Sequence, residues 1–194
     1  MQRSPRMTWL VLLFAMAGCI PSVHPLYTEQ DLIFDPALVG EWADKEGKET
    51  WTFTKNGEKD YKLIYVDREG KAGMFVVHLL KVEDRRFLDF YPDDPELKQN
   101  DFYKAHLLPV HTFMRIQQGE VTLQMTMLKP DWIKKFLRDN PDAVRHEKMD
   151  DTILLTAQPK ELQAFLIKQE KTADAWDECS PLTRRAKKAG EQPW

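Results

Sequence analysis

Short runs of alternating apolar and polar residues dominate the middle of the chain. In the clearest run, residues 121–127, Val121, Leu123, Met125 and Met127 alternate with Thr122, Gln124 and Thr126. A second run, at 50–54, places Trp51 and Phe53 between threonines. Because successive side chains of a β-strand point to opposite faces, this pattern predicts strands with one buried face.

Turn residues separate these runs at short intervals. Asn56-Gly57, a strong hairpin signal, and Arg68-Glu69-Gly70 each lie between two runs. We expect strands at 50–54, 61–65, 73–82, 87–91, 106–117 and 121–127, then a hairpin of 144–148 and 152–157 around Asp150-Asp151. Such spacing predicts an antiparallel up-and-down barrel or a strongly curled sheet of about eight or nine strands.

Two short helices are expected near the C-terminus. Pro130 suits a first helical position, and Asn140-Pro141 ends that helix. Pro159 begins the second helix, whose apolar residues Leu162, Phe165 and Leu166 share one face. The fold class is therefore mostly β, and the polar residues 178–194 are expected to form a disordered tail.

The N-terminus has the layout of a signal peptide. Residues 1–6 contain two arginines, and Met7 to Ala17 is an uncharged, largely apolar run of 11 residues. A helix needs about 20 residues to cross ~30 Å of hydrocarbon, so this run is too short to span a bilayer. It matches the apolar region of an export signal, and small residues then precede Cys19.

The sequence Met16-Ala17-Gly18-Cys19 resembles the lipobox of bacterial lipoproteins, where Leu usually takes the place of Met16. The resemblance implies cleavage before Cys19, a diacylglyceryl group on its Sγ and a fatty acyl chain such as palmitate on its amino group. We therefore expect a signal peptide at 1–18 and a lipidated, extended tether at 19–37. The alternative is an ordinary secretory peptide with a chance cysteine.

The lipobox implies a membrane-anchored protein of the bacterial cell envelope. Ile20, and not an aspartate, follows Cys19, which favours the outer membrane facing the periplasm. Once Cys19 is lipidated, Cys179 has no intramolecular disulfide partner. Loss of residues 1–18 removes two of the 28 basic side chains and leaves all 31 acidic ones, so we expect no nucleic-acid partner.

Gly40-Glu41-Trp42, at the start of the expected domain, resembles the Gly-x-Trp motif of lipocalins and the wider calycin group. The resemblance implies a barrel in which Trp42 packs across one end, often beneath an arginine from a late strand. Arg145 is the candidate partner. The Thr-Asp-x-Tyr turn of lipocalins is missing, and the helix at 130–139 falls where lipocalins continue with strand. The lipocalin-like domain is expected to span residues 38–177.

No catalytic or metal-binding motif occurs in the sequence. His-Glu-x-x-His, Cys-x-x-Cys, a calcium loop and Gly-x-Ser-x-Gly are all missing, and Ser4, Ser22 and Ser180 lie in terminal regions. His106 and His111, five apart on one expected strand, would point to opposite faces. We therefore expect no catalytic residue, no metal site, no cofactor and no enzymatic activity.

Four apolar residues are candidates to line a ligand cavity: Phe113, Met114, Met125 and Met127. The alternative is that they are plain core. Our first hypothesis is a small apolar or amphipathic ligand bound inside the barrel. The second is a non-enzymatic scaffold or assembly lipoprotein that contacts an envelope protein through residues 89–103 and the last helix.

Overall fold

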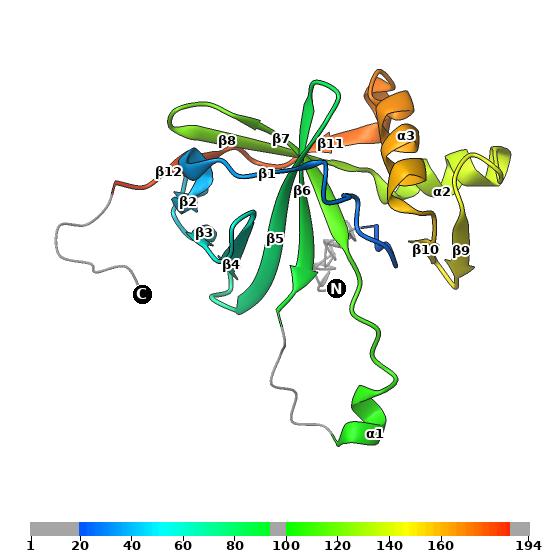
Figure 1. Cartoon of the computed structure of the whole chain (residues 1–194), viewed down its shortest axis with the longest axis horizontal. Coiled ribbons are helices and arrows are strands. Elements are labelled where there is room, and N and C mark those ends of the chain that lie inside the picture. Colours follow the sequence, from blue (N-terminus) through cyan, green and yellow to red (C-terminus); the bar gives the residue numbers. More distant parts are fainter. Residues whose placement is uncertain (1–19, 94–99, 187–194) are drawn as a thin grey trace, which may run out of the picture.

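The computed structural model describes residues 20–93 and 100–186, and eight of its strands close into an antiparallel barrel (Figure 1). Each of the first seven strands pairs with the next, and the eighth lies between the seventh and the first. They are β2 (Gly40–Ala43), β3 (Thr50–Lys55), β4 (Asp60–Val66), β5 (Ala72–Val82), β6 (Arg85–Pro92), β7 (Thr112–Gln118), β8 (Thr122–Leu128) and β12 (Leu182–Arg184). The predicted up-and-down barrel is confirmed, and it is closed because β12 pairs with both β8 and β2.

Strand β12 lies in the stretch that we expected to be a disordered tail, so that expectation is wrong for residues 182–184. Leu182 pairs with Leu123 of β8, and Arg184 pairs with Trp42 of β2. Leu182 is buried in the barrel interior. The domain therefore extends beyond residue 177, because these three residues supply the last contact that closes the sheet.

An accessory unit is inserted between β8 and β12. It contains α2 (Pro130–Asp139), the hairpin β9 (His146–Met149) and β10 (Thr152–Leu155), α3 (Pro159–Gln169), the 3-10 turn η2 (Ala173–Ala175) and β11 (Trp176–Glu178). Both predicted helices are confirmed. The predicted hairpin also forms, but β9 and β10 make a separate two-stranded sheet and are not barrel strands.

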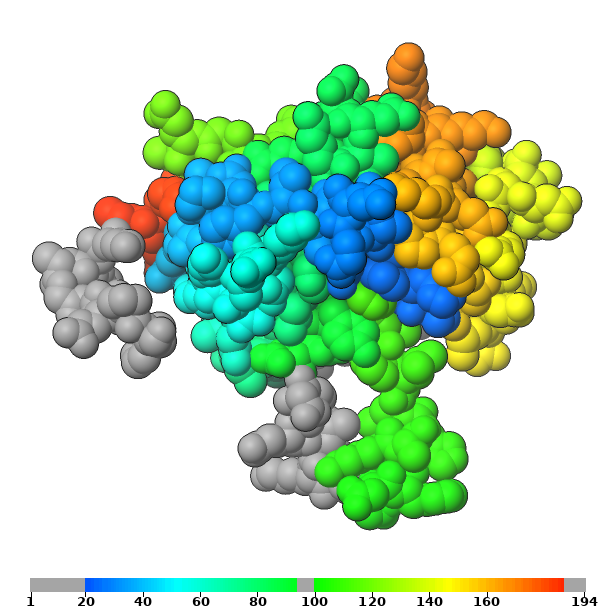
Figure 2. All heavy atoms as spheres, viewed as in Figure 1, coloured from blue at the N-terminus to red at the C-terminus, as the bar shows by residue number. Residues whose placement is uncertain are grey.

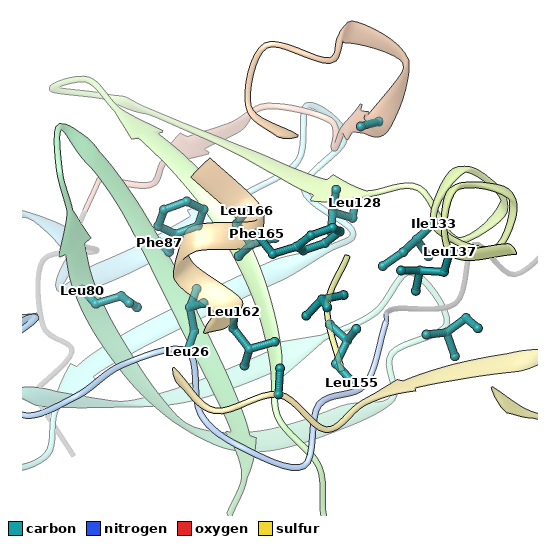
Figure 3. Packing of buried hydrophobic residues seen from close by; sticks show 14 of the residues in the cluster. Leu26, Leu80, Phe87, Leu128, Ile133, Leu137, Leu155, Leu162, Phe165 and Leu166 are labelled. Atoms are coloured by element: carbon teal, nitrogen blue, oxygen red, sulfur yellow. The ribbon is translucent and has the colours of Figure 1, made fainter. Parts of the chain in front are cut away.

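Helix α3 packs on the outer face of the barrel (Figure 3). Its buried residues Leu162, Phe165 and Leu166 belong to the same cluster as Leu80 of β5 and Phe87 of β6. A second cluster fills much of the barrel interior. Within residues 20–93 and 100–186, no helix is long and apolar enough to cross a membrane.

The segment from residue 20 to β2 differs from the extended tether that we expected. Ser22 and Leu26 are fully buried, β1 (Leu32–Ile33) pairs with β5, and the 3-10 turn η1 (Pro36–Leu38) leads into β2. Figure 2 shows residues 20–31, in dark blue, seated between the barrel and the accessory unit. We call residues 20–31 the N-terminal strap.

Trp42 closes one end of the barrel, as the lipocalin resemblance implied. Its ring is fully buried, its Nε1 donates to the Leu38 carbonyl at 2.9 Å, and the guanidinium of Arg184 lies 4.1 Å from the ring centroid. Gly40 has φ +136°, and a Cβ there would lie 2.7 Å from Arg184 Nη1, so glycine is required. The prediction of Arg145 as the partner of Trp42 is wrong, because Arg145 pairs instead with Glu161 of α3.

Candidate ligand-binding site

The end of the barrel opposite Trp42 holds an open cavity of about 430 Å³. Ligand sites of small molecules usually span about 300–1,000 Å³ and are mostly apolar. Eight apolar or aromatic residues line this one: Trp51, Leu63, Tyr65, Phe75, Phe90, Met114, Met125 and Met127. Four polar or weakly polar residues complete the lining: Glu49, Thr112, Cys179 and Ser180.

Strands β3 to β6 supply an aromatic wall. The Trp51 ring lies 4.6 Å from the Tyr65 ring and 5.9 Å from the Phe90 ring, centroid to centroid. Phe75 meets Phe90 edge-on at 6.5 Å. These mutual contacts fix the rings without filling the space beside them, so the wall is preformed for an apolar guest.

Strands β7 and β8 supply a methionine wall, where three of the four predicted ligand residues lie. Met114, Met125 and Met127 line the cavity, but Phe113 does not. Phe113 follows the strand alternation outward and packs against the cluster under α3. The prediction for Phe113 is therefore wrong in position, while the aromatic wall is what the sequence reasoning missed.

The mouth is polar around Glu49. Trp51 Nε1 donates to Glu49 Oε1 at 2.9 Å, and Arg68 Nε lies 3.7 Å from the other carboxylate oxygen. Asp44 accepts backbone hydrogen bonds from Lys48 and Glu49 and so holds the turn between β2 and β3. Burial raises the pKa of Asp44, but these hydrogen bonds outweigh burial and leave the pKa below its usual value. Among the lining residues, Glu49 alone carries a full charge.

Cys179 contributes to the rim of the cavity through the segment that links β11 to β12. Its N–H donates to the Met125 carbonyl at 2.9 Å, and its carbonyl accepts from Gln124 Nε2 at 2.6 Å. No local pattern marks this position, since Cys179 is placed by its hydrogen bonds to β8.

The histidines lie outside the cavity. The expected strand over residues 106–117 begins only at Thr112, and His106 is exposed. His111 Nδ1 lies 2.7 Å from Asp89 Oδ1 under the N-terminal strap, while His78 stacks on Tyr27 with centroids 4.3 Å apart. Burial lowers the pKa of His78, which favours its neutral form. The described part of the chain contains no group of three metal-ligating side chains.

Comparisons of this chain with protein-family models, with curated proteins and with solved structures find no match. The closed barrel of eight antiparallel strands, with Trp42 beneath an arginine of its last strand, is consistent with a lipocalin-like fold.

Proposed function

We propose that this chain is a lipid-anchored protein of the bacterial cell envelope that holds a small apolar or amphipathic ligand in its barrel. The cavity carries the proposal. It measures about 430 Å³, and aromatic and methionine side chains line most of it. Methionine is flexible and polarisable, so its wall adapts to guests of varied shape. Binding without catalysis is the activity that we propose.

The lining also limits the chemistry of the ligand. An acyl chain or an apolar ring would be in contact with Phe90, Met114 and Met125, which are almost fully buried. At the mouth, the Glu49 carboxylate accepts from Trp51 Nε1 and lies 3.7 Å from Arg68 Nε, so the polar end of a ligand would meet an acidic and a basic group together. We therefore propose a ligand whose polar end is neutral or zwitterionic.

Native mass spectrometry tests the ligand directly. Residues 20–194, exported behind an ordinary signal peptide and purified without detergent, should carry an extra mass that is lost on denaturation. Met127→Trp fills the mouth of the cavity and should lower the bound fraction about tenfold. Val121→Trp, at an exposed turn of the Trp42 end, is the control and should retain the mass. An empty wild-type protein would contradict the proposal.

The membrane anchor rests on the lipobox resemblance, because Cys19 lies outside the described residues. We propose that Cys19 attaches the chain to the outer membrane, on the side facing the periplasm. Each buried methylene contributes ~0.8 kcal/mol, and two or more acyl chains are needed for stable attachment.

Labelling the full chain with radioactive palmitate in bacteria checks this anchor. We expect wild-type protein and the Cys179→Ser control to take up the label and fractionate with membranes. Cys19→Ser should lose all of the label and keep residues 1–18. A wild-type protein that is cleaved elsewhere and carries no label would show that the lipobox is not used.

The alternative, a scaffold that acts through protein contacts, receives less support. Of the surfaces expected for it, Asp89 is fully buried, and the apolar face of α3 is covered by its packing on the barrel. Residues 101–109 remain exposed, and they carry the following inference.

A further inference from the structure

Residues 101–109, between β6 and β7, project from the barrel. Figures 1 and 2 show this segment, in green, extending away from the body beside the strand ends. Every residue in it is exposed, including Phe102 (79%), Tyr103 (53%), Leu107 (45%) and Leu108 (67%). Soluble proteins rarely leave large apolar side chains together in water, so such a group marks a contact surface. We call residues 101–109 the apolar tip.

The apolar tip is locally ordered by its own hydrogen bonds. Asn100 caps the short helix α1 (Asp101–Lys104) by accepting from the Tyr103 N–H at 2.9 Å. Four further amides, those of residues 104–107, donate to carbonyls within residues 100–104 at 3.0 or 3.1 Å. Backbone groups that are already paired lose little on leaving water, so this tip suits a lipid interface.

The tip stands beside the cavity mouth. Phe90, two residues before the end of β6, and Thr112, the first residue of β7, both line the cavity. Directly after β6, the Asp93 N–H donates to the carbonyl of Met74, whose side chain is 48% exposed. The apolar tip and the cavity opening therefore lie at the same end of the barrel.

The position of the expected anchor selects a membrane as the partner. Ser22 and His111 exchange two backbone hydrogen bonds of 2.8 Å directly before β7 begins. Two residues lie between Cys19 and Ser22. These three steps along the chain span at most ~3.6 Å each, or about 11 Å in total. A lipid on Cys19 would thus hold the bilayer within about 11 Å of Ser22, which lies beside the start of β7.

We propose that the apolar tip inserts into the membrane next to the cavity mouth, so that an acyl-chain lipid passes directly between the bilayer and the barrel. This inference rests on the proposed function, because it takes the anchor and the cavity as given. Tyr103 is suited to the headgroup region, since its ring is apolar and its hydroxyl is polar.

Fluorescence quenching tests the insertion. The mature lipidated protein, with Leu107→p-azidophenylalanine coupled to a fluorophore, is placed in phosphatidylethanolamine–phosphatidylglycerol vesicles that contain spin-labelled acyl chains. We expect strong quenching at position 107. The matched control, Val121→p-azidophenylalanine, carries its label at an exposed apolar site of the opposite end and should stay unquenched. Equal quenching at both positions would overturn the inference.

Lipid transfer separates this inference from the proposed function. The double variant Phe102→Asp and Leu108→Asp should extract a fluorescent phospholipid from vesicles about tenfold more slowly than wild type. Both proteins should bind the same probe equally in detergent micelles. If the variant extracts lipid at the wild-type rate, the tip has no role. If neither protein binds the probe in micelles, it is the cavity function that fails.

Discussion

Replacing Trp42 by alanine is expected to lower the free energy of unfolding by about 3–5 kcal/mol, as for other fully buried aromatic residues. Trp42 is completely buried, donates to Leu38 at 2.9 Å and lies beneath Arg184. Its removal leaves a void where η1, β2 and β12 meet, and the neighbouring backbone cannot collapse into it. Urea unfolding followed by circular dichroism measures the loss, and the Tm should fall by roughly 10 °C.

Two variants identify the source of this loss. Trp42→Phe retains a ring but loses the hydrogen bond to Leu38, so it should cost about 1–2 kcal/mol. Arg184→Ala removes the stacked guanidinium, and a double-mutant cycle with Trp42 should give a coupling of about 0.5–2 kcal/mol. A Trp42→Ala protein that unfolds at the wild-type urea concentration would contradict closure of the barrel at this end.

The barrel was predictable because its strands carry a local signal. Alternation over Thr50–Lys55 and Thr122–Leu128 indicates which side chains face inward. Short turns join the neighbouring strands. The closing strand was not predictable, because Leu182–Arg184 is too short to show alternation. The hairpin β9–β10 consists of two short antiparallel strands joined by a tight turn, as neighbouring barrel strands do. Only long-range pairing excludes it and makes Arg184, instead of Arg145, the partner of Trp42.

The candidate cavity was predictable in part, for a related reason. Alternation placed Met125 and Met127 on one face, and they line the cavity together with Met114. Phe113 was grouped with them despite its opposite orientation. Which inward residues line the cavity and which fill the core depends on strand register, and register is a property of pairs of strands.

The apolar tip shows a further limit of pattern reasoning. Leu107 and Leu108 fit the apolar run that predicted a strand from residue 106, yet both are exposed. Apolar residues indicate burial, but a sequence does not say whether the burial is within the chain or against another surface. That distinction needs the position of residues 101–109 relative to the barrel.

Asp89→Ala is expected to destabilise the protein by about 3–5 kcal/mol, because it removes a buried charged acceptor and leaves its partners unsatisfied. The carboxylate is fully buried on the outer face of β6. Its Oδ2 accepts from the Leu26 N–H at 2.7 Å, and its Oδ1 lies 2.7 Å from His111 Nδ1. The Leu26 carbonyl accepts from Gln163 of α3 at 2.8 Å. Asp89 thus holds the N-terminal strap between the barrel and α3.

Amide hydrogen exchange locates the effect of this variant. In Asp89→Ala, the amides of Ser22, Val23 and Leu26 should exchange faster, since the strap that they fix loses its central contact. Asp89→Asn retains the shape and one acceptor, so it should cost about 1–3 kcal/mol. The exposed control Asp142→Ala should stay within about 0.5 kcal/mol of wild type. If the strap amides stay protected in Asp89→Ala, the backbone hydrogen bonds of Ser22 with His111 and of Val23 with Leu155 are sufficient to hold the strap.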